Sequence, residues 1–100
     1  MIRSLLFLHA KPGHGIELLR TLERLGVLAM ASEEAGFLGV EVATAVADED
    51  DIVLTGFWAS LEHYKRWQAG PTPDRLLAEV ESHLATAPVS HVYHVVEAVS

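Results

Sequence analysis

The sequence contains no cysteine and has few basic residues. Without cysteine, a disulfide framework, a thiolate zinc site, an iron–sulfur cluster and a cysteine nucleophile are all excluded. Seven Lys and Arg against fourteen Asp and Glu give a net charge of −7, which disfavours binding to duplex nucleic acid or to an anionic membrane surface. We therefore expect no nucleic-acid partner, no membrane partner and a cytoplasmic location.

Long apolar runs are also missing. The longest, Leu25 to Ala31, has seven residues and is too short to span a membrane. The apolar segment at 2–10 is interrupted by His9 and followed by Lys11, where a signal peptide has small residues before its cleavage site. We interpret this segment as a strand.

Hydrophobic residues, in contrast, are abundant for the length of the chain. One hundred residues allow one domain, which we place over residues 1–100. Half of the residues are hydrophobic and the mean hydropathy is +0.25, although a domain of this size buries only about two-thirds of its chain surface. The surplus indicates a partner subunit, a ligand cavity or both.

The hydrophobic pattern predicts four strands and three helical segments. Apolar residues that alternate or run together predict strands, and apolar residues at helical spacing predict helices. Gly36 is a suitable residue to end the first helix, and the acidic run at 48–51 a suitable turn between two strands. The predicted strands span 2–10, 37–47, 52–59 and 89–99, and the predicted helices span 15–34, 61–69 and the segment from Thr72 to Pro88.

This order of elements is typical of a ferredoxin-like α+β fold, a split β-α-β arrangement. Such a fold has a four-stranded antiparallel sheet with its helices on one face. Alternate residues on the other face are apolar too, so water covers that face poorly. We therefore expect a homodimer whose two sheets pack face to face.

Three short passages of the chain resemble those of antibiotic biosynthesis monooxygenase-like proteins. The passage from Phe57 to Trp67, FWASLEHYKRW, matches a W-x-S-x-x-x-[aromatic] pattern that follows their third strand. Lys11-Pro12-Gly13 is similar to the turn before their first helix, and 34–41, EAGFLGVE, is similar to their entry to strand two. The spacing of the three passages holds over nearly the whole chain, and the superfamily that they indicate is the dimeric α+β barrel.

The resemblance implies a cleft between sheet and helices in each subunit. Some members oxygenate polycyclic phenols there without metal or flavin: a base removes a proton from the substrate, and the carbanion reacts with oxygen. We therefore expect a cofactor-independent monooxygenase acting on an aromatic or polyketide-like small molecule. Two alternatives stay open, a haem-binding or haem-degrading protein and a non-catalytic small-molecule-binding stress-response dimer, because one fold serves many functions.

The haem-degrading branch of the superfamily resembles this chain at Trp67, where an indole packs against the haem. It requires a histidine ligand about ten residues later, where this chain has Leu77, and it favours an asparagine near Phe7 or His9. His83 follows Leu77 by six positions, roughly 240° round a helix, and so points elsewhere. A haem cofactor is therefore disfavoured.

Histidine supplies the candidates for proton transfer near neutral pH. His9 shares the odd-numbered side of the first strand with Leu5 and Phe7. If that side faces the helices, His9 lines the cleft and is the favoured catalytic base. The alternative is a histidine at a strand end that bonds a backbone carbonyl.

The last strand carries two further histidines, His91 and His94. Residues three apart on a strand face opposite sides, so this pair cannot chelate one metal ion, and we expect no metal site. One of the two is expected to line the substrate pocket and the other to face the dimer interface. The sequence leaves open which is which, and a polar rim of the interface is an equal alternative for either.

Aromatic side chains supply the candidate pocket wall. Tyr64 and Trp67 lie three apart and share one face of a short helix, and with Phe7 they suit a flat aromatic ligand. The alternative is that they fill a small core beneath this helix. Trp58 and Ser60 are expected to be structural, the first as an anchor and the second as the helix N-cap.

Overall fold

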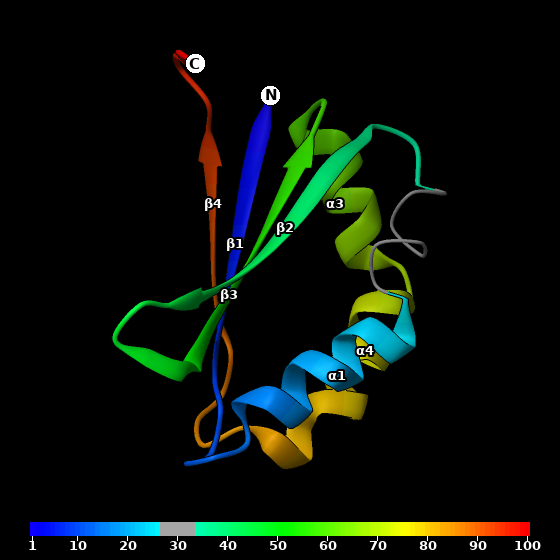
Figure 1. Ribbon diagram of the computed structural model, residues 1–100. Helices are drawn as coiled ribbons and strands as arrows, with labels where there is room; N and C mark the ends of the chain where they lie inside the picture. The colour runs from blue at the N-terminus through cyan, green and yellow to red at the C-terminus, as the bar shows by residue number, and fades with distance from the viewer. Residues whose placement is uncertain (27–33) are drawn as a thin grey trace.

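The computed structural model describes residues 1–26 and 34–100. Its four strands form one sheet in the order β2-β3-β1-β4, with every neighbouring pair antiparallel. The helices all cover one face of this sheet, and the other face is open (Figure 1). The predicted ferredoxin-like α+β fold is thus confirmed. The strands are β1 (Ile2–His9), β2 (Phe37–Ala45), β3 (Asp48–Trp58) and β4 (Val89–His94), and the helices are α1 (Gly15–Leu25), α3 (Leu61–Ala69), α4 (Thr72–Val80) and the 3-10 turn η1 (Glu81–His83).

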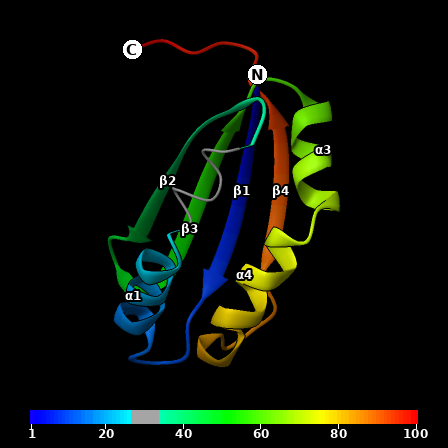
Figure 2. The same cartoon turned by 90° about the vertical axis from the view of Figure 1, so that its right-hand side faces the viewer.

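The even-numbered side of β1 faces the helices. Ile2 and Leu8 on that side are almost fully buried, whereas Arg3, Phe7 and His9 on the other side are exposed. Figure 2 shows α1, α3 and α4 lying along this covered face. Two groups of buried side chains pack there. One contains Leu8, Ala10, Leu18, Leu22, Ile52, Leu54, Val80 and Leu84, and the other contains Ile2, Trp58 and Tyr64.

Helix α1 ends earlier than the sequence predicts. Gly26 caps the helix in a left-handed conformation (φ 63°), and its N–H donates to the carbonyl oxygens of Glu23 and Leu22. This local signal for termination comes ten residues before Gly36, so the predicted helix boundary at Glu34 is wrong. The part of the prediction over 27–33 lies outside the described residues.

The acidic run at 48–51 belongs to a strand rather than to a turn. The chain reverses at 46–47, and β3 begins directly at Asp48. Three residues of β3 bulge away from β2, since Thr44 pairs with Ile52 while Ala45 pairs with Asp48. The predicted turn is wrong because this segment has a second partner: His9 of β1 pairs with Asp51, and Ala10 N donates to Asp50 O at 2.8 Å.

The final strand is also shorter than predicted. Strand β4 ends at His94, which pairs with Ile2 at the start of β1. One further hydrogen bond, from Val95 N to Met1 O at 3.0 Å, involves the residue before β1 and is the last that this strand can accept. The residues after Val95 therefore have no pairing partner on β1, and Figure 1 shows them leading away from the sheet.

The open face of the sheet is largely apolar, as the alternation predicts. Phe7 is 43% exposed there, and its neighbours across the strands include Val53, Val89 and, two positions further along β4, His91. The Phe7 and His91 rings meet edge to face with centroids 6.1 Å apart. Among the described residues, none of the helices is both long and apolar enough to cross a membrane.

Candidate active site

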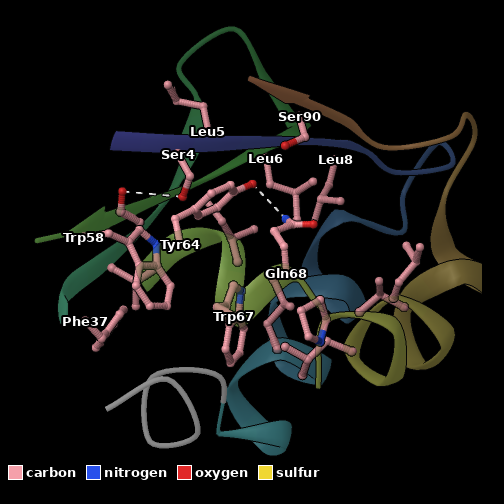
Figure 3. A pocket seen from close by; sticks show the side chains of 18 residues that line it. Ser4, Leu5, Leu6, Leu8, Phe37, Trp58, Tyr64, Trp67, Gln68 and Ser90 are labelled. Carbon is pink, nitrogen blue, oxygen red and sulfur yellow. Dashed lines mark hydrogen bonds between the residues drawn. The ribbon is translucent and has the colours of Figure 1, made fainter. Parts of the chain in front are cut away.

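A cavity of about 150 Å³ lies between the covered face of the sheet and helices α3 and α4. The floor comes mainly from the central strands β1 and β3, with further residues from β2 and β4. The aromatic wall is formed by Phe37 and Trp58 of the sheet and by Tyr64 and Trp67 of α3 (Figure 3). The lining is mainly aliphatic and aromatic, with a few polar groups along one side. Such a lining is typical of sites for small, mostly apolar ligands.

Trp58 is the centre of the aromatic wall. Its side chain is 3% exposed, and it contacts three other rings: Phe37 at 5.3 Å, Trp67 at 5.8 Å and Tyr64 at 6.1 Å between centroids. The contacts to Phe37 and Tyr64 are edge to face, which aromatic pairs favour. Trp58 therefore anchors α3, as expected, and also lines the cavity, which the sequence analysis did not predict.

Helix α3 is held at its start by Ser60. The Ser60 Oγ accepts from His63 N at 3.3 Å and lies 2.7 Å from His63 Nδ1, so the predicted N-cap is present. The His63 ring in turn lies against Gly36 at the entry to β2. This arrangement fixes the rotation of α3 about its axis, and with it the direction of Tyr64 and Trp67.

The polar side of the cavity is formed by Ser4, Tyr64, Gln68 and Ser90. Gln68 Nε2 donates to the Tyr64 hydroxyl oxygen at 2.7 Å, and the Ser4 hydroxyl donates to the Gly56 carbonyl oxygen at 3.5 Å. Figure 3 shows both bonds, with the Tyr64 hydroxyl close to the Gln68 side chain. The sequence analysis did not predict Gln68 as a site residue. Its position four residues after Tyr64 on one helix would have placed the two side chains next to each other.

Tyr64 is the only ionisable side chain among the described residues that line the cavity. Leu77 lines it at the position where the haem-degrading branch needs a histidine ligand. The described lining offers no imidazole and no thiolate for iron, and the Tyr64 oxygen already accepts from Gln68. The described lining thus offers haem iron no ligand of the kind that the resemblance to the haem-degrading branch implies.

Of the six residues predicted for the site, Tyr64 and Trp67 line the cavity, and the other four do not. Phe7, His9 and His91 lie on the open face of the sheet. The expectation that the odd side of β1 faces the helices is wrong, because Ile2 and Leu8 occupy that direction. The alternation had fixed which residues share a side, and the packing of the helices decided which side is covered.

His9 and His94 each have a definite place outside the cavity. His9 Nδ1 lies 3.2 Å from Asp51 Oδ1 on the solvent-exposed side, so its partner is a carboxylate rather than the backbone carbonyl considered above. His94 pairs with Ile2, which assigns it to the covered side of the sheet and His91 to the open side. His94 is exposed at the end of β4, beyond the cavity.

A second polar region lies at the opposite end of the sheet from α3. Asp50 accepts from Gly13 N at 3.0 Å and from Gly15 N at 2.8 Å. These two hydrogen bonds hold the pKa of the Asp50 carboxyl below its ordinary value of 3.8, and the bond from Gly13 has the larger effect. His14 and His83 bring their Nδ1 atoms to 3.2 Å and are both half-buried.

This region also contains three side chains of metal-binding type. His9, Asp48 and Asp51 have ligand atoms within 4.8 Å of one another in the described part of the chain. All three are exposed to solvent, on the side of the sheet away from the cavity. They are not part of the candidate active site.

The family to which the chain belongs follows from its sequence profile. The profile of the antibiotic biosynthesis monooxygenases matches residues 1–78, which include β1 to α3 and most of α4. The chain belongs to the antibiotic biosynthesis monooxygenase family. No curated protein matches the sequence.

Solved structures of the antibiotic biosynthesis monooxygenase family share this fold. A protein from Deinococcus radiodurans, named for the same family, is 20% identical, with a TM-score of 0.84 over 100% of this chain and 97% of its own. SnoaB from Streptomyces nogalater, described as a cofactor-independent oxygenase, is 11% identical, with a TM-score of 0.81 over 97% of this chain and 94% of its own. At these identities the likeness shows the fold alone.

Proposed function

We propose that this member of the family oxygenates a small phenolic compound in the cavity without a protein-bound metal or flavin. The observation that carries the proposal is the cavity itself, with its wall of Trp58, Tyr64 and Trp67 beside one polar edge. Its volume of about 150 Å³ is close to that of an engineered protein cavity that binds benzene. We therefore propose a single-ring substrate in place of the polycyclic compound that the resemblance implies.

The chemistry balances with the substrate as the sole electron donor. A phenol that has lost its hydroxyl proton carries negative charge on the para carbon, which forms a bond to O₂. The resulting peroxide anion takes up a proton to give a hydroperoxide. The O–O bond of the hydroperoxide then breaks, and the departing hydroxide combines with the proton lost from the para C–H bond to leave as water. Phenol and O₂ thus give quinone and water, with one oxygen atom in each product.

The chain's own residues bind and orient the phenol in this scheme. Flat contacts to Trp58 and Trp67 hold the ring, and the Tyr64 hydroxyl meets the phenol oxygen. No stronger base than Tyr64 lines the described part of the cavity. We therefore assign the first proton to solvent rather than to His9, which lies on the other side of the sheet.

A homodimer is part of the proposal. The apolar open face supports it, because water is a poor cover for side chains such as Phe7, Val89 and Tyr93. A second copy can cover this face sheet against sheet. The cysteine-free sequence fits the reducing cytoplasm, where we propose that the dimer acts.

One observation favours a second candidate, non-catalytic binding of a small aromatic molecule. The described cavity lining has no histidine, carboxylate, lysine or arginine to take part in acid–base chemistry. A binding protein needs only the aromatic wall and the polar edge.

Oxygen uptake separates the two candidates. Purified protein, treated with a chelator and free of flavin, is mixed with 2-methylphenol in an oxygen electrode. Oxygenation predicts one O₂ consumed per quinone formed, and a slower reaction with the tricyclic anthrone. The Trp67→Ala variant is expected to lose at least tenfold in kcat/KM, whereas Lys65→Ala, on the exposed side of α3, keeps the rate. Binding of 2-methylphenol without oxygen uptake would favour the second candidate.

A further inference from the structure

We propose that Tyr64 and Gln68 together make the cavity selective for the ionised form of a single-ring phenol. The inference rests on the proposed function, since it concerns the same cavity, and it adds the charge state that the site recognises. It assigns Tyr64 as the hydrogen-bond donor to the phenolate oxygen. Gln68 is the positioning residue that orients this donor.

The Tyr64 ring has a fixed orientation. Its side chain is 8% exposed, it meets the Trp58 ring edge to face at 6.1 Å, and it belongs to the buried group with Ile2. A ring held in this way can still rotate its hydroxyl hydrogen, which prefers two positions in the plane of the ring. The direction of that hydrogen therefore depends on what the oxygen accepts.

Gln68 decides this direction. Its Nε2 donates to the Tyr64 oxygen at 2.7 Å and so occupies one side of the hydroxyl group. The Tyr64 hydrogen is left to the other side, where it can be donated to a ligand. Gln68 therefore acts through Tyr64 and does not contact the ligand oxygen. The polar edge thus presents the Tyr64 hydroxyl as an oriented donor.

A phenolate oxygen binds more favourably at this polar edge than a neutral phenol hydroxyl does. A phenolate only accepts, and hydrogen bonds to a charged acceptor are roughly twice as strong as neutral ones. A neutral phenol also has a proton to donate, but the Tyr64 oxygen already accepts from Gln68. No carboxylate in the described lining repels the anion. Donors fixed at the position of a developing oxyanion are a general means of stabilising it in a water-poor site.

Burial opposes this preference, because an apolar wall disfavours a charged ligand. The hydrogen bond offsets that cost only if the donor points at the ligand before it arrives. The bond from Gln68 to Tyr64 supplies this orientation in the free protein. We therefore expect hydrogen bonding to stabilise the bound phenolate by more than burial destabilises it. The pKa of the bound ligand measures the difference between these two effects.

The test uses 4-nitrophenol, whose ionised form is yellow, and nitrobenzene, which has the same ring without the hydroxyl group. Visible titration gives the pKa of 4-nitrophenol bound to the full chain, and tryptophan fluorescence gives both affinities. We expect the pKa of the bound phenol to be lower than that of the free compound by about one unit, so that the phenolate binds about tenfold more tightly than the phenol.

Variants separate recognition of the anion from packing of the ring. Tyr64→Phe is expected to remove the shift in the ligand pKa while changing nitrobenzene affinity by less than about threefold, since only a hydroxyl is lost. Gln68→Leu should reduce the shift, and Gln68→Glu should reverse it, because a carboxylate accepts a hydrogen bond from the Tyr64 hydroxyl, turning this donor away from the ligand, and repels the phenolate. Lys65→Ala should leave all values unchanged. Gln68 is exposed at the surface of α3, so its variants remain informative even if Tyr64→Phe fails to fold.

A bound 4-nitrophenol whose pKa equals or exceeds that of the free compound overturns the inference. So does a shift that survives in Tyr64→Phe, or a failure of the wild-type protein to bind either ligand. A lowered ligand pKa without any oxygen uptake from 2-methylphenol keeps the inference and removes the oxygenase proposal. Oxygen uptake without a lowered ligand pKa keeps the oxygenase proposal and overturns the inference.

Discussion

The Asp50 carboxylate accepts a 2.8 Å hydrogen bond from the backbone N–H of Gly15, although 35 positions separate the two residues in the chain. With a second bond from Gly13 N, it satisfies N–H groups at the start of α1 that a helix cannot satisfy internally. The N-cap residue His14 makes no side-chain cap of its own. A residue of β3 therefore performs the capping of α1 from across the fold.

Replacing Asp50 by Asn is expected to lower the melting temperature at pH 7. The amide offers one acceptor oxygen in place of two and turns an N–H group toward a backbone donor. The chain's net charge of −7 means that removing any negative charge relieves some repulsion. Glu49→Gln, an equal change of charge at an exposed neighbour, is the control. Equal melting temperatures for the two variants would contradict the capping role.

The effect of Asp50 should also depend on pH. Its folded-state pKa lies below the ordinary value of 3.8, because the N–H groups of Gly13 and Gly15 stabilise the ionised form. The stability it contributes is thus fully present above about pH 3.8 and is lost as the pH falls through the folded-state pKa. Denaturant unfolding from pH 7 to pH 2 should show the difference between wild type and Asp50→Asn shrinking only in the acid range. A difference that changes mainly between pH 5 and 7 would exclude this cause.

Gly36 is expected to resist substitution for two separate reasons. Its φ of +78° favours glycine, and a Cβ there would meet the ring of His63. Gly36→Ala should therefore cost more than the roughly 1–2 kcal/mol of a left-handed alanine. Gly13→Ala is the matched control, since Gly13 has φ +80° with nothing within 4 Å of its Cβ position.

Chemical denaturation of Gly36→Ala with His63→Ala tests the steric part. The second change should recover the excess cost over Gly13→Ala and leave the cost of the left-handed conformation. If Gly36→Ala and Gly13→Ala destabilise equally, the His63 ring moves aside freely and does not fix α3.

Trp58 and Trp67 are expected to differ in what they support, although their rings lie 5.8 Å apart. Trp58 is almost fully buried, so Trp58→Ala should cost about 3–5 kcal/mol in urea unfolding. Trp67 is half-buried, so Trp67→Ala should cost less and mainly weaken nitrobenzene binding. Equal losses of stability, with ligand binding intact in Trp67→Ala, would assign both residues to the core alone.

Phe7→Glu should dissociate the proposed dimer. A charge in the middle of two packed sheets has no partner and is costly to bury, whereas in a monomer the same change is near neutral. Sedimentation should shift from about twice the chain mass of 10.9 kDa to that mass. Ile16→Glu, at an exposed apolar residue of α1 (49% against 43% for Phe7), is the control and should stay dimeric. A wild-type protein that sediments with the mass of a single chain, 10.9 kDa, would contradict the proposed dimer.

Much of the fold could be read from local patterns. The helical spacing of Leu18 and Leu22 predicted the buried side of α1, and Ser60 predicted the start of α3. Tyr64 and Trp67 could be predicted to share a face because their spacing matches the helical turn. Each of these statements concerns residues that are neighbours along one element, so the sequence contains the information.

Two of the errors concern residues that meet across the fold. His9 was expected in the cavity because alternation along β1 defines two sides without saying which one the helices cover. The acidic run at 48–51 was expected to be a turn because its partners, His9 and Gly15, lie far away in the sequence. In both cases the deciding contact comes from another element.

The sequence by itself determined the order of strands and helices, the two sides of each strand and the aromatic content of α3. These follow from the periodicity of the backbone and from side-chain size. Tertiary structure alone decided that Ile2 and Leu8 turn inward, that Phe7 and His9 turn outward, and that Tyr64 and Gln68 line a cavity. The physical reason is that burial is a property of two packed surfaces, and a single strand or helix specifies only one of them.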